Sequence, residues 1–252
     1  LSVSADREKD NYRCIKPWCM LRIIKLVKET KKARQERIGR IIAELDKKYG
    51  TQHRCFLNYK YDWQLLFAVI LSAQCTDERV NMVTKDLFVK YKTLQDFAQA
   101  EVKEMERDIK SIGLYRAKSK NLILCAKRLA EVYDGKVPSD IDELTTLAGV
   151  GRKTANVIRG NIYNIPSIVV DTHVKRISKK LGLTESDEPV KVEYELMKIL
   201  PKDHWILWNI DIITLGRTIC IARREKCEEC FLNKNCPSSK VQISENTVYE
   251  TA

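Results

Sequence analysis

The residue types with the clearest chemical potential follow one another in one short stretch of the chain: a glycine turn, two cations and an aspartate. Gly149, Val150 and Gly151 form the turn, and Arg152 and Lys153 open the helical pattern after it. Backbone N–H groups at a helix N-terminus bind phosphate, so these residues are candidate contacts to a polyanion. From the turn alone, a simple bend followed by two solvated cations is an equally good interpretation, at a cost of roughly a few tenths of a kcal/mol.

Lys153 is also a candidate nucleophile. A free lysine amine, with a pKa of about 10.4, is almost fully protonated near neutral pH and cannot attack carbon. A helix N-terminus, an adjacent arginine and partial burial each favour the neutral amine. The sequence supplies the first two of these influences, so we expect an activated amine at this position.

Asp171 is the third member of the stretch. It lies between a β-branched run, 168–170, and a helical pattern that begins at Val174. Spacing alone favours an ordinary N-cap. A capping role and a catalytic role are compatible, because a capping carboxylate at the rim of a pocket can also stabilise positive charge that develops on a bound sugar. Asp171 is therefore the second candidate catalytic residue.

Four of the nine cysteines are clustered near the C-terminus with the spacing C-x6-C-x2-C-x5-C: Cys220, Cys227, Cys230 and Cys236. Thiols this dense indicate a metal site or a disulfide cluster. Disulfides do not suit a basic, mostly helical chain of this size without a secretory signal. Cysteine thiolates are also zinc ligands, so zinc stays an alternative, although structural zinc sites more often have two C-x2-C pairs. Cys75 and Cys125 are expected to be small core residues.

The composition points to a negatively charged partner. The formal charge is +11 and the pI is near 9.2, and neutralisation of phosphate by Lys and Arg is the main sequence-independent source of affinity for nucleic acid. Charge alone is weak evidence, since ribosomal and membrane-surface proteins are also basic. Arg223 and Arg224 stand in a basic loop, 221–226, where phosphate contact is favoured over a solvated turn.

Apolar residues recur at helical spacing along most of the chain. The segments with this pattern are 38–49, 80–91, 122–133 and 192–200. Residues 63–71 are apolar on every side, which is typical of a central buried helix. No segment alternates convincingly with period two, and turn signals fall at Gly113, Gly135 and Gly182. We therefore expect an all-α fold with short loops.

The residues LAGVGRKTANV, the VVDTH that follows and the four clustered cysteines together resemble the endonuclease III family of helix-hairpin-helix DNA glycosylases with an iron–sulfur cluster. The resemblance runs from about residue 37 to residue 237 and covers three independent motifs in the same order. It implies an all-α helix-hairpin-helix glycosylase fold. A six-helix barrel and a discontinuous iron–sulfur cluster domain would flank the active-site cleft.

The resemblance also implies the domain limits. The expected segments are an N-terminal extension at 1–34, the cluster domain at 35–55 and 166–240, the barrel with its helix-hairpin-helix at 56–165, and a C-terminal tail at 241–252. The extension has no apolar periodicity and is expected to be flexible. Met20 within it is an alternative start.

By resemblance, the protein is a bifunctional DNA glycosylase and AP lyase of base excision repair. The neutral amine of Lys153 would attack C1′ of an extruded nucleoside, while Asp171 stabilises oxocarbenium character or assists proton transfer. The resulting Schiff base would allow β-elimination and strand cleavage. The implied substrates are oxidised or ring-saturated pyrimidines and abasic sites in double-stranded DNA.

The resemblance assigns further residues to DNA and to the cluster. The implied DNA contacts are Gln74, Leu114, Gly149, Val150, Gly151, Arg152, Arg223 and Arg224. Gln74 and Leu114 match residues that fill the gap left by an extruded base. Without the resemblance, a helix cap and a core leucine are the ordinary interpretations of these two. The four clustered cysteines would hold a structural [4Fe–4S] cluster.

Two other functions stay open. The adenine glycosylase branch lacks the lysine and carries a catalytic glutamate on the helix that ends near Gln74, whereas residues 67–71 contain no carboxylate. A non-catalytic DNA-binding module would use the hairpin and a cysteine-bound metal only for structure. Ala148 replaces the usual proline, and Leu215 replaces a frequent histidine near the cluster, which leaves cluster tuning open. His173 is expected to be structural rather than an acid or base.

The expected setting follows from the same resemblance. We expect a monomer that acts without a membrane in the cytoplasm of a prokaryote, associated with the nucleoid. The apolar patch at 20–27 is too short and too charged to cross a membrane.

Overall fold

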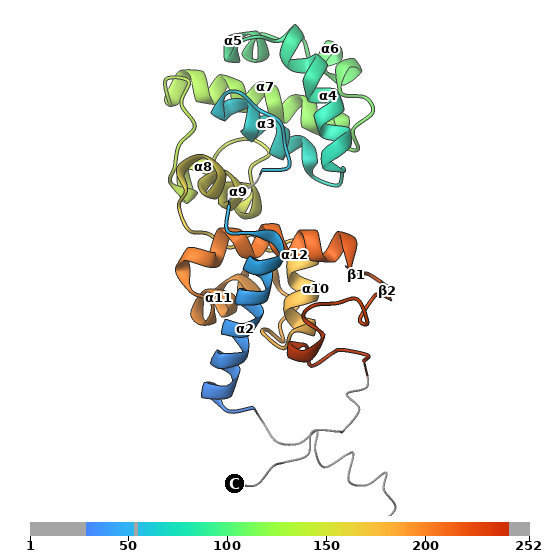
Figure 1. Cartoon of the computed structure of the whole chain (residues 1–252). Helices are drawn as coiled ribbons and strands as arrows, with labels where there is room; N and C mark the ends of the chain where they lie inside the picture. Colours follow the sequence, from blue (N-terminus) through green and yellow to red (C-terminus); the bar gives the residue numbers. More distant parts are fainter. Residues whose placement is uncertain (1–28, 53–54, 242–252) are drawn as a thin grey trace, which may run out of the picture. The chain divides into compact units, whose positions relative to one another are not determined.

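The computed structural model describes residues 29–52 and 55–241 (Figure 1). Most of the predicted N-terminal extension and C-terminal tail therefore lies outside the described residues. The chain divides into two compact units, Leu1–Arg37 and Ile38–Ala252. The first contains the beginning of helix α2, and the second contains all the sites described below.

The described residues are mainly helical, so the predicted all-α fold is confirmed. The elements are α2 (Lys31–Tyr49), α3 (Asp62–Ser72), α4 (Asp77–Lys90), α5 (Leu94–Ala98), α6 (Val102–Asp108), α7 (Tyr115–Val132), α8 (Ile141–Thr145), α9 (Arg152–Tyr163), α10 (Thr172–Lys180), α11 (Pro189–Ile199), the 3-10 helix η2 (Lys202–His204), α12 (Trp205–Thr218), the strands β1 (Cys220–Ile221) and β2 (Arg224–Glu225), and the 3-10 helix η3 (Asn233–Asn235). The two strands pair antiparallel and are too short to show alternation in the sequence. None of the described helices combines the length and apolar surface that a membrane span requires.

Helices α3 to α9 surround the first of two apolar cores (Figure 1). Helix α3 lies at its centre, and residues 65–71 are at most 7% exposed, because this helix is apolar on every side. Phe67 and Phe97 contact each other edge-on, with ring centroids 4.9 Å apart. Trp63 packs against both rings at 5.5 Å. The predicted central buried helix is confirmed.

The second core is built by α10, α11, α12 and the part of α2 from Ile38 onward. Ile38, Ile41 and Leu45 are each at most 2% exposed, which confirms the predicted apolar stripe. Pro189 occupies the first turn of α11, where its missing N–H costs nothing. The two cores support the predicted domain limits, which stay a prediction.

The predicted glycine turn joins α8 to α9. Gly149 has φ +81°, a left-handed conformation that glycine adopts without strain. A Cβ at this position would lie 3.0 Å from Cβ of Asn121 on α7 and 3.2 Å from Cγ2 of Ile70 on α3. Conformation and packing therefore both require glycine, and this close packing holds the start of α9 against the first core.

Candidate active site

A cavity of about 280 Å³ lies where the two cores meet. Its walls are the C-terminal end of α3, the starts of α9 and α10, and one face of α12. Lys153 and Asp171 both line it. The tertiary structure thus brings together the two residues that were predicted to be catalytic.

Lys153 is the second residue of α9, so it lies at the positive end of the helix dipole. Its side chain is exposed. Arg152, the neighbouring cation, is paired with a carboxylate and is largely neutralised. Of the two activating influences predicted from the sequence, the helix N-terminus is therefore present and the arginine is weakened. The third influence, burial of the amine, is absent because the side chain is exposed.

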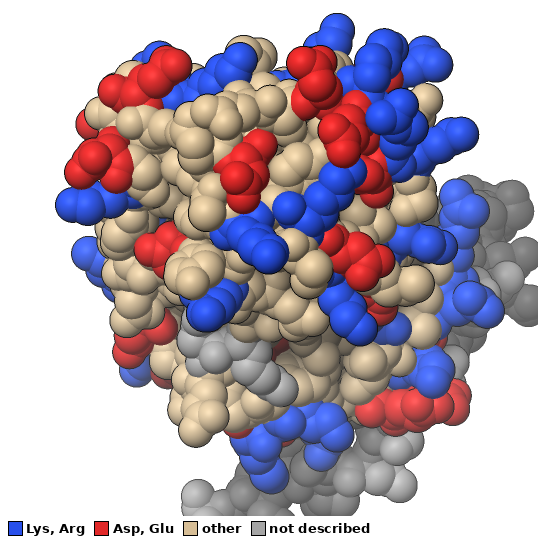
Figure 2. Space-filling model, turned by 90° about the horizontal axis from the view of Figure 1, so that it is seen from above, with Lys and Arg blue, Asp and Glu red and all other residues tan. Residues whose placement is uncertain are grey.

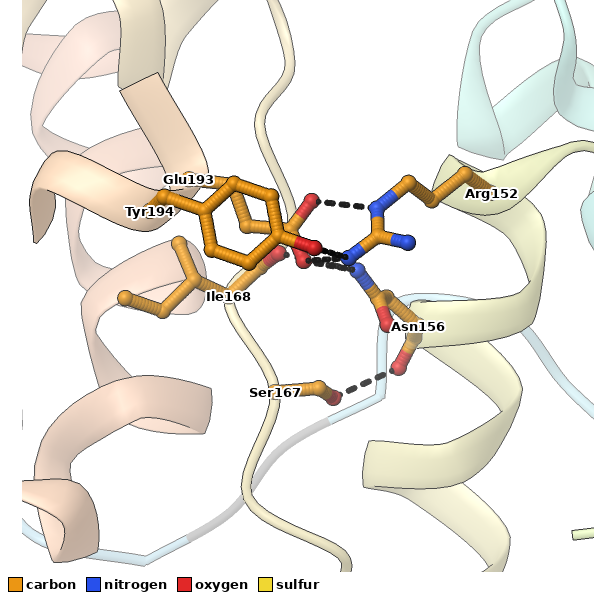
Figure 3. A network of polar contacts seen from close by, with 6 residues as sticks. All are labelled: Arg152, Asn156, Ser167, Ile168, Glu193 and Tyr194. Carbon is orange, nitrogen blue, oxygen red and sulfur yellow. Dashed lines mark hydrogen bonds and ion pairs between the residues drawn. The ribbon is translucent and has the colours of Figure 1, made fainter. Parts of the chain in front are cut away.

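Arg152 and Glu193 form a bidentate ion pair between α9 and α11 (Figure 3). Nε and Nη2 of Arg152 each lie 2.9 Å from a carboxylate oxygen of Glu193, which is 6% exposed. The sequence made this cation a candidate contact to a polyanion, but in the structure Glu193 already offsets its charge at the helix N-terminus. A DNA contact by Arg152 stays a prediction, and it would have to form while the guanidinium is engaged.

The glycine turn between α8 and α9 offers fewer free N–H groups than the sequence predicted. The N–H of Val150 donates to the carbonyl of Leu147 at 3.1 Å, and the side chain of Val150 is buried. This N–H is therefore not free for a phosphate, contrary to the expectation for the whole turn. Gly149 and Gly151 are exposed, and their N–H groups have no hydrogen-bond partner within the described residues. They remain the candidate phosphate donors.

Asp171 is the N-cap of α10, as predicted. Its Oδ1 accepts a hydrogen bond of 2.7 Å from the backbone N–H of Val174. This bond satisfies one of the free donors of the first turn and fixes the carboxylate at the cavity wall. The capping role is confirmed, and the catalytic role stays a prediction.

His173 lines the same cavity. Burial lowers the pKa of its imidazole, and nearby cations add to this effect while Asp171 opposes it. A Cβ added to Gly216 would collide with Nδ1 of this ring, which shows how closely the ring packs on α12. The tight packing of this ring on α12 supports the predicted structural role.

Gln74 and Leu114 share an unusual backbone conformation. Both are left-handed, with φ of 56° and 61°, which costs a residue other than glycine roughly 1–2 kcal/mol. Both are exposed, and Leu114 is 59% exposed, so the core interpretation of this leucine is wrong. Their loops are adjacent, because a Cβ on Gly113 would lie 3.6 Å from the carbonyl oxygen of Gln74. Two strained, exposed residues on adjacent loops are typical of a functional site.

Lys118 of α7 holds the end of α3 that carries Gln74. This lysine is 4% exposed, and its Nζ donates to the carbonyls of Leu71 at 2.9 Å and Ala73 at 2.6 Å. Lys118→Met would leave these carbonyls without their donor, so we expect the free energy of unfolding to fall by about 1–3 kcal/mol. Urea denaturation measures this change.

Lys120 on the same helix is the matched control. It is exposed, so Lys120→Met is expected to change the free energy of unfolding by no more than about 0.5 kcal/mol. Equal effects of the two replacements would contradict the assigned role of Lys118.

The four clustered cysteines line one cavity of about 30 Å³ and are all free thiols. The β1–β2 hairpin explains part of this arrangement, because Cys220 lies in β1 and Cys227 follows β2 closely. Burial raises the pKa of Cys230, and the other three cysteines raise it further. Four thiolates at this place would therefore need a compensating positive charge. As they stand, no three His, Cys, Asp or Glu side chains among the described residues are arranged as a metal-ion site.

The basic loop, 221–226, comprises the turn and the second strand of the same hairpin. Arg223 and Arg224 are exposed, and Arg223 has a left-handed backbone with φ 67°. Glu225, the acidic residue of the loop, forms ion pairs of 2.9 Å with Lys180 and 3.0 Å with Lys240, which lower its pKa to about 2. The two arginines therefore project from a loop whose own carboxylate is already neutralised.

The face shown in Figure 2 carries basic and acidic side chains interspersed with each other. The net positive charge of the chain is therefore not gathered into one basic patch on this face. The candidate phosphate contacts remain the cavity, the glycine turn between α8 and α9, and the basic loop.

Several residues of the site had no local signal in the sequence. Arg217 of α12 lines the cavity and donates to Asp77 at 2.7 Å. Asn209 also lines it, and its Oδ1 is buried without a hydrogen-bond partner in the described part of the chain. Such an atom normally binds water or ligand. These residues were missed because their contacts join segments far apart in the chain.

The fold and the site can now be compared with known proteins. Residues 67–202 match the HhH-GPD superfamily of base excision DNA repair proteins. The chain is therefore a member of this superfamily, and α8, the glycine turn and α9 are its helix-hairpin-helix, with the cavity beside it.

Its relatives narrow the assignment. Endonuclease III of Synechocystis is 44% identical over 209 residues, which are 82% of this chain and 95% of the relative. Endonuclease III of Bacillus subtilis is 47% identical over 183 residues, 72% of this chain and 84% of the relative. A trapped covalent intermediate of an endonuclease III with DNA superposes with a TM-score of 0.77 at 43% identity, covering 82% of this chain and 97% of that chain. The chain belongs to the endonuclease III family.

Proposed function

We propose that this protein removes oxidised pyrimidines from double-stranded DNA by Schiff-base chemistry at Lys153 and then cleaves the strand by β-elimination. Membership of the family makes it an enzyme of base excision repair, a DNA glycosylase with AP lyase activity. The observation that carries the proposal is the shared cavity, which has Lys153 on the wall from α9 and Asp171 on the wall from α10.

The damaged nucleotide must first leave the base stack. Gln74 and Leu114 are exposed on adjacent loops, and their left-handed backbone directs two large side chains outward at a place where glycine would be the easier residue. They would enter the gap left in the duplex. Gly149 and Gly151, with exposed N–H groups, and the arginines of the basic loop would hold the DNA backbone.

The covalent step takes place at C1′ of the extruded nucleoside. The lone pair of the neutral Lys153 amine forms a bond to C1′ as the glycosidic bond breaks. The electron pair of the glycosidic bond leaves with the base, which takes up a proton that the alkylated amine releases. The carboxylate of Asp171 stabilises the positive charge that develops on the sugar. After the ring opens, the iminium makes a C2′ proton acidic, and its removal expels the 3′ phosphate and cuts the strand.

Two alternatives are less well supported. An adenine glycosylase of the same superfamily would need a carboxylate near the end of α3, where residues 65–71 are buried and uncharged. A DNA-binding module would have no use for a lysine and an aspartate at one cavity. Capture of a covalent intermediate separates the Schiff-base enzyme from both alternatives.

The four clustered cysteines would hold a [4Fe–4S] cluster. Their number and type match the ligands of such a cluster. Its positive iron charge would also offset the repulsion between thiolates around the small cavity they line. When bound, the cluster would supply cross-links between the β1–β2 hairpin and the C-terminal segment. The basic loop with Arg223 and Arg224 would thereby be held toward DNA.

Loss of one ligand tests this assignment. Cys230→Ser is expected to reduce bound iron from about four atoms per chain to below about one, because a serine hydroxyl is a poor replacement for a thiolate. Iron analysis and visible absorbance of the purified protein measure this. Cys55→Ser, which changes an exposed cysteine outside the cluster, should retain full iron. Stoichiometric zinc in the purified protein would contradict the cluster.

The partner is duplex DNA with a damaged pyrimidine or an abasic site, bound by a monomer. The relatives that match over most of their length come from bacteria. Action on nucleoid DNA of a prokaryotic cell, without a membrane, is the corresponding setting.

The direct test is incubation with duplex DNA that contains thymine glycol, in the presence of borohydride, followed by a denaturing gel. We expect a covalent protein–DNA band, because borohydride reduces the Schiff base to a stable amine. Intact DNA binding without such a band would exclude the Schiff-base mechanism, and base release would then be assayed without strand cleavage.

A further inference from the structure

We infer that the Arg152–Glu193 ion pair is a positioning clamp that sets the relative placement of Lys153 and Asp171, and that Arg152 is not a DNA phosphate contact. The inference rests on the proposed function, because it concerns the geometry of that same site. It assigns roles to Glu193 and Asn156, which lie outside the cavity that contains the reaction.

The clamp is a closed network (Figure 3). Both carboxylate oxygens of Glu193 accept hydrogen bonds of 2.9 Å from Arg152, and Oε1 also accepts one of 3.1 Å from Nδ2 of Asn156. The Tyr194 hydroxyl accepts at 3.2 Å from Nη2 of Arg152, and its ring lies 5.4 Å from the guanidinium carbon. Glu193 is thus saturated by donors from α9, which a carboxylate exposed by only 6% requires.

Helix geometry separates this network from the catalytic face of α9. Arg152 and Asn156 are four residues apart and share one face, which contacts α11. Lys153 and Val157 share the next face, and both line the cavity. Because the helix is rigid, the contact between Glu193 and one face determines the rotation of the other face.

The same network reaches the segment that leads to Asp171. Nδ2 of Asn156 donates to the carbonyl of Ile168 at 3.3 Å, and Oγ of Ser167 donates to the carbonyl of Asn156 at 2.9 Å. Ile168 lies three residues before Asp171 in the non-helical segment between α9 and α10. The clamp therefore connects the helix that carries Lys153 to the segment that leads to Asp171, and the placement of both residues depends on it.

A phosphate contact by Nε or Nη2 of Arg152 would compete with this arrangement. To bind DNA with both of its engaged nitrogens, Arg152 would leave the carboxylate of Glu193 buried without its cation, which is unfavourable. The sequence motif places Arg152 beside the nucleophile, and the structure explains that place without a phosphate.

The test combines binding and kinetics in the full-length protein. The variants are Arg152→Gln, Glu193→Gln and the double replacement, and Asp187→Asn, which removes an exposed ion pair with Lys179, is the control. DNA affinity is measured against salt concentration with a duplex that contains an uncleavable tetrahydrofuran abasic analogue. Single-turnover base excision and borohydride trapping are measured with thymine glycol DNA.

We expect each single variant to lower the rate of base excision by roughly 10- to 100-fold, the effect of a misplacement of about 1 Å. The double variant should be no slower than either single one, because the two residues act as one unit. The dependence of affinity on salt should stay that of the wild type, since no phosphate contact is lost. Asp187→Asn should match the wild type throughout.

Three results would overturn the clamp. One is a slope of DNA affinity against salt concentration that falls by about one phosphate contact in Arg152→Gln but not in Glu193→Gln. That result would make Arg152 a phosphate contact. Another is independent, multiplicative rate losses in the double variant. The third is wild-type base excision per folded molecule in both Glu193→Gln and the double variant. These two variants are decisive because neither leaves a carboxylate buried without its cation.

The control for the function is separate. Wild-type protein that binds the analogue but forms no trapped adduct would refute the proposed Schiff-base chemistry. The salt dependence of binding in Arg152→Gln would still decide whether Arg152 contacts phosphate, because that measurement needs no reaction.

Discussion

Lys153→Gln is expected to abolish the borohydride-trapped adduct and to lower strand cleavage by more than about a thousandfold, because the amide cannot form a Schiff base. DNA binding should stay near that of the wild type. The side chain is exposed in the free protein, so the replacement leaves no cavity and no unpaired buried group. Trapping on thymine glycol DNA and binding to a tetrahydrofuran duplex measure the two effects side by side.

Lys103 supplies a matched control. It is also the second residue of a helix, α6, and its side chain is 82% exposed away from the cavity. Lys103→Gln is expected to trap and cleave at the wild-type rate. Strand cleavage by Lys153→Gln at the rate of this control would exclude the proposed nucleophile.

Asp171→Asn is expected to slow base excision by about 10²- to 10⁴-fold while the protein stays folded. Asparagine caps a helix about as well as aspartate, so the hydrogen bond to the N–H of Val174 can be kept while the charge is removed. The variant therefore separates the electrostatic role from the capping role. Single-turnover kinetics measures the first, and thermal unfolding measures the second.

Asp171→Ala and Asp140→Asn complete this experiment. The alanine variant loses both roles and should unfold more easily by about 1 kcal/mol than the asparagine variant. Asp140 caps α8 outside the cavity by accepting from the N–H groups of Asp142 and Glu143, so Asp140→Asn should leave base excision unchanged. An Asp171→Asn protein that excises at the wild-type rate would leave only the capping role.

Features that depend on neighbours in the chain could be predicted from the sequence. The N-cap at Asp171 joins residues only three apart, and the proline start of α11 needs no partner at all. The central helix α3 follows from an unbroken apolar run, because such a run has no face to present to water. The glycine turn before α9 was predicted for its backbone freedom, although its close packing on Asn121 was not.

The exposure and strain of Gln74 and Leu114 needed the tertiary structure. An isolated leucine beside a glycine is ordinarily a core residue, and nothing in its local sequence requires a left-handed backbone. Packing of the surrounding helices imposes that conformation. Lys118 is a similar case, since its carbonyl partner on Leu71 is 47 residues away.

The sequence by itself determined the helical class, the motif that carries Lys153, the cap at Asp171 and the grouping of four cysteines, because each depends on residues close together in the chain. Only the tertiary structure decided that Arg152 pairs with Glu193, 41 residues away. The chain contains 34 Asp and Glu residues, and spacing along it does not indicate which of them reaches a given arginine. That choice depends on how α9 and α11 pack, and the same packing brings Lys153 and Asp171 to one cavity.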